Sequence, residues 1–146
     1  MTYEEFQQRY EAESDETFAR LNKLDEKTLL AMIAARHKDI WDSGGNYQIW
    51  RVLAQKGSES SIWPLFDIVS DLRHAYLIRY HACDALFEIA GIRDEGFKGE
   101  VQYGLDTRQQ PVDQQQAIRK LEQMLRASEG TRVARPVKRK PWWKIG

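Results

Sequence analysis

A histidine and a cysteine lie two positions apart in the apolar stretch AYLIRYHACDALFEIAG, residues 75–91. Both side chains can bind a metal ion, and a histidine beside a cysteine can activate the thiol as a nucleophile. On an α-helix, however, residues i and i+2 point about 200° apart, so His81 and Cys83 cannot face one ligand. We therefore expect Cys83 to be a small packed side chain and His81 to be a partly exposed polar one.

Other residues with catalytic potential are few. One cysteine and three histidines in the whole chain are a thin set of ligands for a zinc site. Acidic pairs such as Glu4 and Glu5 lie where helices are expected to begin, and carboxylates there interact favourably with the helix dipole. The stretch DSGGN lacks the lysine and the spacing of a phosphate-binding loop. We predict no catalytic residue, no metal site and no cofactor; an enzyme that uses His37, His81 or residues 92–110 is the minor alternative.

The composition sets the class of protein. The chain has 146 residues, a one-domain length, and its 42% hydrophobic and 30% charged residues are typical of soluble proteins. The formal net charge is zero, so no global field attracts the whole molecule to nucleic acid or membrane. A lone cysteine, a charged N-terminus and the lack of an apolar run of about 18–20 residues lead us to expect a cytoplasmic protein without a membrane span.

Apolar spacing predicts an all-α fold of about six helices over residues 1–130. The expected helices are Tyr3–Leu21, a helix capped by Asp25 that runs to Trp41, Tyr47–Lys56, Ile62–Leu72, Ala75–Ala90 and Pro111–Ser128. The fourth helix is expected to use Ser61 as its N-cap, which places Pro64 in the first turn. Gly96, Gly99 and Gly104 break the pattern, so residues 92–110 are predicted to form a long loop or a small hairpin.

Residues 60–91 carry a recognisable pattern. Two apolar helices are separated by a short break, with an early proline in the first; the second contains Arg79, Ala82, Ala85 and Leu86 and ends IAG. This pattern resembles a HEAT-like (armadillo-type) helical repeat unit, and residues 25–57 match it less well. The resemblance implies antiparallel helical pairs in a short α-solenoid or bundle. It also implies a function in binding, mostly of other proteins and in a few cases of nucleic acid.

Several aromatic side chains lie off the expected apolar helix faces. Trp63 is one position from the face of its helix, and Tyr76 and Tyr80 lie off the face that contains Ala82. Trp, Tyr and Arg dominate the energetics of protein interfaces. We therefore predict that Trp63, Tyr76, Arg79 and Tyr80 bind a partner protein, unless a neighbouring helix covers them. This favours a non-catalytic interaction module, such as a small inhibitor, an immunity-type protein or an adaptor.

The C-terminal segment, residues 131–146, has a different composition, with six basic residues and no acidic residue. Its candidate nucleic-acid contacts are Arg135, Lys138, Arg139, Lys140, Trp142, Trp143 and Lys144. Cations can contact phosphates while tryptophans stack on bases. The same composition suits an anchor at an anionic membrane surface, packing against the acidic N-terminal helices, or a flexible end. The sequence does not indicate the identity of the partner or the oligomeric state.

Overall fold

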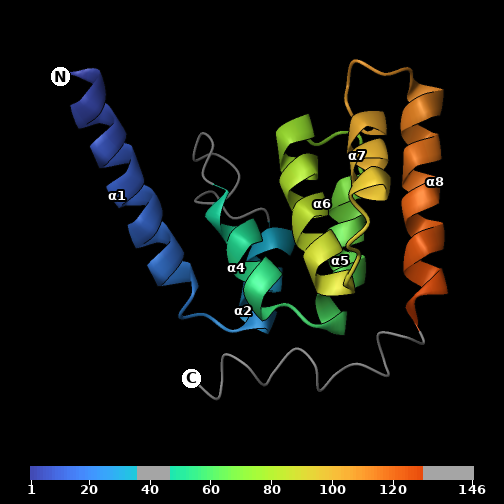
Figure 1. Cartoon of the computed structure of the whole chain (residues 1–146). Helices are drawn as coiled ribbons and strands as arrows, with labels where there is room; N and C mark the ends of the chain where they lie inside the picture. Colours follow the sequence, from blue (N-terminus) through green and yellow to red (C-terminus); the bar gives the residue numbers. More distant parts are fainter. Residues whose placement is uncertain (36–46, 130–146) are drawn as a thin grey trace.

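The computed structural model describes residues 1–35 and 47–129, which form seven helices and no strand (Figure 1). The helices are α1 (Tyr3–Leu21), α2 (Glu26–Ala34), α4 (Gln48–Lys56), α5 (Glu59–Ser70), α6 (Tyr76–Ala90), α7 (Glu95–Gly104) and α8 (Pro111–Ala127). The prediction of an all-α fold built from paired helices is confirmed. The predicted extension of the second helix to Trp41 falls partly outside the described residues.

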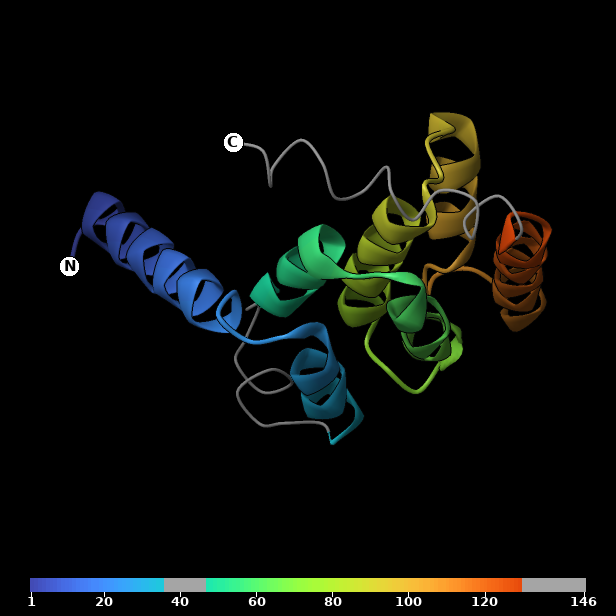
Figure 2. The same cartoon turned by 90° about the horizontal axis from the view of Figure 1, so that it is seen from below.

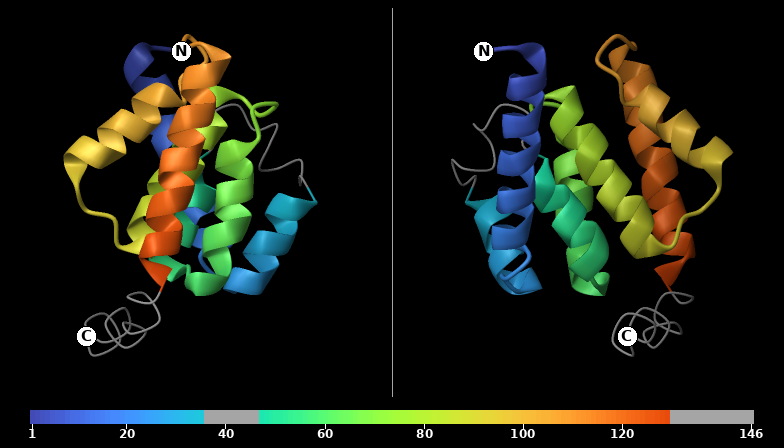
Figure 3. Two further views of the ribbon diagram at one scale, coloured as in Figure 1. Left: turned by 90° about the vertical axis from the view of Figure 1, so that its right-hand side faces the viewer. Right: turned by 60° about the vertical axis from the view of Figure 1, so that its left-hand side comes forward.

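The helices lie in two layers (Figure 2). Helices α1, α4, α6 and α7 follow one another in one layer, while α2, α5 and α8 form the other. Figure 3 shows α1 at one end of the row and the α7–α8 pair at the other end. Along the chain the helices pair as α2–α4, α5–α6 and α7–α8. The first helices of the first two pairs, α2 and α5, share one layer. In the last pair the order is reversed, because α7 lies beside α6 and α8 lies beside α5.

The antiparallel pair α5–α6 forms the centre of the core. Its buried side chains are Ser61, Ile62, Leu65, Phe66 and Val69 on α5, and Arg79, Ala82, Cys83, Ala85, Leu86, Phe87, Ile89 and Ala90 on α6. Gly91 ends α6 in the left-handed conformation, with φ of 73°. Glycine adopts this conformation without the steric cost that a Cβ atom imposes.

Hydrogen bonds hold α2 against the start of α5. The Glu26 carboxylate accepts hydrogen bonds from the Ser58 amide at 2.6 Å and the Ser58 hydroxyl at 2.8 Å, and also from the Ser61 hydroxyl. Because of these contacts, α5 begins earlier than predicted, and Ser58 rather than Ser61 is its N-cap. Pro64 therefore lies inside α5, at an exposed position, and not in the first turn.

Residues 95–104 form helix α7, so the predicted loop or hairpin over residues 92–110 is wrong. The Asp94 side chain caps the helix by accepting a hydrogen bond from the Phe97 amide at 3.0 Å. Phe97, Val101 and Leu105 are spaced four residues apart, and the last two are fully buried. Each glycine costs a helix about 1 kcal/mol relative to alanine, and burial of this apolar face outweighs that cost. Gly104 also permits close packing, because a Cβ atom there would lie 2.7 Å from the Cβ of Ala117 on α8.

Candidate protein-binding surface

His81 and Cys83 occupy separate environments, as the helical spacing predicts. Cys83 is fully buried, and burial raises the pKa of its thiol well above the usual range. The thiol is therefore protonated at neutral pH and unsuited to act as a nucleophile. His81 is half-buried, and burial lowers the pKa of its imidazole. Within residues 1–35 and 47–129, no group of three His, Cys, Asp or Glu side chains is placed to hold a metal ion.

The structure separates the four residues that the sequence predicts as one binding surface. Trp63 lies near the start of α5, whereas Tyr76 and Tyr80 lie in the first turns of the antiparallel α6, at the opposite end of the pair (Figure 1). The guanidinium of Arg126 on α8 lies 4.9 Å from the centre of the Trp63 ring, and Phe66 meets that ring edge-on. Trp63 is thus partly covered by α8, which is the alternative that the sequence left open.

Arg79 is not a surface residue, and its predicted role in partner contact is wrong. Its side chain is fully buried, and its Nε donates a hydrogen bond to the His74 carbonyl at 3.2 Å. The reason is its position on α6: Arg79 precedes the buried residues Ala82, Cys83 and Leu86 by three, four and seven positions, so all four share the core face. The prediction takes Arg79 as an exposed residue because of its residue type.

The guanidinium of Arg79 is held in an unusual setting. Its two terminal nitrogens, Nη1 and Nη2, are buried and donate no hydrogen bond to any described side chain or backbone group. The guanidinium lies 5.8 Å from the centre of the Tyr76 ring. Burial lowers the pKa of Arg79, while Tyr76, Asp106 and Asp71 act in the opposite direction. Both carboxylates have closer partners of their own, Arg108 for Asp106 and Arg73 for Asp71.

Aromatic rings follow one another across the outer surface of α6. Tyr47, directly before α4, stacks on His81 with 4.0 Å between ring centroids and 22° between planes. Tyr80 meets His81 edge-on at 5.4 Å, and Tyr76 lies 5.9 Å from Tyr80. Leu77, on the same side of the helix, is 52% exposed. We call these five residues, Tyr47, Tyr76, Leu77, Tyr80 and His81, the α6 aromatic face.

The two ends of the α6 aromatic face are anchored to neighbouring helices. Tyr76 donates a hydrogen bond from its hydroxyl to the Gln102 carbonyl on α7 at 3.0 Å, and Tyr47 belongs to the start of α4. Such contacts hold the rings in place at the surface of α6. Tyr47, Leu77 and His81 were not predicted as binding residues. No local pattern signals the Tyr47–His81 stack, because the two residues are 34 positions apart in the sequence.

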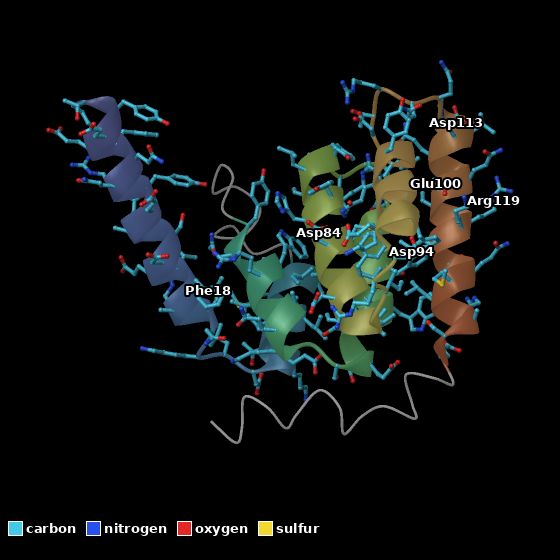
Figure 4. The ribbon with its side chains drawn as sticks, in the orientation of Figure 1. Phe18, Asp84, Asp94, Glu100, Asp113 and Arg119 are labelled. Atoms are coloured by element: carbon cyan, nitrogen blue, oxygen red, sulfur yellow. The ribbon has the colours of Figure 1, made fainter. Side chains whose placement is uncertain are left out.

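The outer side of α6 becomes acidic beyond the α6 aromatic face. Asp84 and Glu88 are exposed there, and Asp84 accepts a hydrogen bond from the Gln102 side chain at 2.7 Å (Figure 4). Glu88 pairs with Arg93 at 3.3 Å. Because α6 contains no lysine and its one arginine, Arg79, is buried, the helix presents aromatic and acidic groups outward.

The residues of the second predicted site, Arg135 to Lys144 in the C-terminal segment, lie outside the described residues, as does His37.

No helix in residues 1–35 and 47–129 combines the length and apolar character that a membrane crossing requires. Comparison of the chain with protein-family models, with curated proteins and with solved structures finds no match.

Proposed function

We propose that this chain is a non-catalytic protein-binding module that contacts its partner through the α6 aromatic face. The observation that carries the proposal is the set of adjoining rings Tyr47, His81, Tyr80 and Tyr76, fixed between α4 and α7 at the protein surface. Tyrosine offers a large contact area with few rotatable bonds, which is why it is enriched at binding hot spots. The buried, protonated thiol of Cys83 supports a non-catalytic role.

The charges around the surface indicate the chemistry of the partner. Leu77 and Tyr80 offer an apolar contact, while Asp84 and Glu88 provide carboxylates one to two turns further along α6. A matching partner surface carries an apolar or aromatic anchor beside lysine or arginine side chains. Such charges mainly increase the association rate and the specificity, whereas the apolar anchor supplies most of the affinity.

A module of this kind suits a dedicated inhibitor, an immunity-type protein or an adaptor. The resemblance of residues 60–91 to a HEAT-like repeat unit supports the same proposal, because such units mostly bind proteins.

Capture of partners by the tagged full chain tests this proposal. We expect a partner that is retained by the unmodified chain and lost from the double variant Leu77→Ser, Tyr80→Ala. The matched control is Tyr103→Ala with Val112→Ala, which removes two exposed apolar side chains from α7 and α8. Circular dichroism confirms that each variant is folded. Retention of the same proteins by the α6 variant and the control would contradict the proposal.

The composition of residues 131–146 favours a second candidate function, binding of nucleic acid through the C-terminal segment. If it binds there, the affinity of the full chain for a labelled single-stranded oligonucleotide falls steeply with salt, because each phosphate contact releases counterions. Deletion of residues 132–146 then abolishes binding. Salt-insensitive binding, or equal binding after the deletion, would exclude this function.

A further inference from the structure

The N-terminal half of α1 carries an exposed aromatic stripe. Tyr3, Phe6 and Tyr10 are 76%, 58% and 49% exposed and lie on one side of the helix. Figures 1 and 2 show this half of α1 directed away from the other helices. We call Tyr3, Phe6 and Tyr10 the α1 stripe. It is an apolar helix surface that no described part of the chain covers.

The α1 stripe continues the side of α1 that packs on the core. Phe18 points toward α4, where the guanidinium of Arg51 lies 5.0 Å from its ring centre (Figure 4). Leu21, at the end of α1, is buried. Helix α4 has only 9 residues against 19 in α1, so it covers only the C-terminal part of this side. The N-terminal part of this side is left open to an elongated segment.

The charge of α1 indicates what kind of segment could pack on the α1 stripe. Six acidic residues and two basic ones give α1 a net charge of −4. At 100° per residue, Glu13 borders the edge of the α1 stripe at Phe6, whereas Glu4 and Glu11 lie about 80–100° beyond the other edge at Tyr3. Two copies of α1 packed through the stripe would bring together two helices that each carry a net charge of −4, which disfavours a dimer of this helix. A basic segment that contains aromatic side chains is the complementary occupant.

The chain itself contains such a segment. We propose that residues 131–146 of the same molecule dock on the α1 stripe, with Trp142 and Trp143 against its rings and the basic residues beside its carboxylates. Tryptophan can bury a large area against tyrosine and phenylalanine. The six positive charges and absence of negative ones in this segment complement the net charge of α1. This contact is independent of the α6 aromatic face.

The length of the segment permits this contact. Contacting helices connect α8 to α1 through α5, α6 and α4, and four spacings of 8–10 Å amount to about 40 Å. The C-terminal ends of α8 and α1 lie at the same end of the molecule (Figure 1), and Tyr10 lies about 16 Å further along α1. The straight-line distance is thus at most about 43 Å, and the 13 residues from Glu129 to Trp142, which follow the helical Ser128, span about 43–47 Å when extended. Tethering also gives the segment a millimolar effective concentration.

Disulfide trapping in the full chain tests the proposal. The variant Gln7→Cys, Lys144→Cys places one thiol directly beside the α1 stripe and the other in the segment. The native Cys83 is fully buried with a raised thiol pKa, so it does not compete. Under mild oxidation we expect an intramolecular disulfide, identified by mass spectrometry, at least tenfold faster than in the control Glu88→Cys, Lys144→Cys on α6. Equal rates, a disulfide-linked dimer or no disulfide would overturn the proposal.

Two further variants show whether docking brings the thiols together. Adding Phe6→Gln and Tyr10→Gln to the double-cysteine chain should slow the intramolecular disulfide at least tenfold, and 500 mM salt should slow it further. Both side chains are exposed and glutamine is a good helix former, so the fold is retained. Adding Tyr103→Gln on α7 should leave the rate unchanged. An unchanged rate after the α1 substitutions would show that the stripe does not hold the segment.

Discussion

The ring of Tyr47 stacks on the imidazole of His81, with 4.0 Å between their centroids. The stack joins the start of α4 to the outer surface of α6 and places both rings in the α6 aromatic face. Burial lowers the pKa of the His81 imidazole, an effect that the nearby Asp84 partly opposes. The surface proposed to bind a partner therefore contains a group whose charge depends on pH.

The lowered pKa of His81 predicts a loss of stability in mild acid. The unfolded chain takes up a proton near the ordinary histidine pKa of 6.5, whereas the folded chain does so only at lower pH. Between the two pKa values the unfolded state binds more protons, so the free energy of unfolding falls as pH is lowered below about 6.5. Urea unfolding at pH 7.5 and 5.5 measures this. The His81→Asn variant should lose less stability over that interval; an equal loss would show that His81 is not responsible.

Arg79 should contribute through packing and not through its charge. Asp71 and Asp106 keep Arg73 and Arg108 as partners without it, and the Arg79 terminal nitrogens form no hydrogen bond within residues 1–35 and 47–129. Replacement of a buried charge by an apolar side chain of similar size is often neutral. We expect Arg79→Met to change the free energy of unfolding by less than about 1 kcal/mol and Arg79→Ala to reduce it by about 2–5 kcal/mol. A large loss in the methionine variant would show that the guanidinium itself is required.

The N-cap of α7 should be measurable in stability. Asp94→Ala removes the acceptor of the Phe97 amide hydrogen bond and should lower the free energy of unfolding by about 1 kcal/mol. Gln115→Ala, at an exposed position of α8, should change it by less than about 0.5 kcal/mol. Urea unfolding of both variants at pH 7.5 compares them. Equal small effects would indicate that α7 does not depend on this cap.

Much of the helical architecture could be predicted from local signals. The caps at Asp25 and Gly91 and the proline that begins α8 are all found where the sequence places them. In each case the signal is contained within a few residues. The helical spacing likewise predicted correctly that His81 and Cys83 face different surroundings.

The errors arose where distant parts of the chain decide the structure. Helix α7 forms despite its glycines because Val101 and Leu105 are buried against other helices. Helix α5 begins early because Glu26, more than 30 residues away, binds Ser58. The burial of Arg79 could have been noticed from its spacing to Ala82 and Leu86, but its polarity argued for exposure.

The partner affinity of the α6 aromatic face is the most direct test of the proposed function. Isothermal titration of the captured partner should show at least about a thirtyfold weaker Kd for Tyr80→Ala, as expected when a hot-spot residue contributes 2 kcal/mol or more. The control Tyr103→Ala should bind as the unmodified chain does. A Kd unchanged by Tyr80→Ala, and by Leu77→Ser in the same titration, would contradict the assignment of this surface.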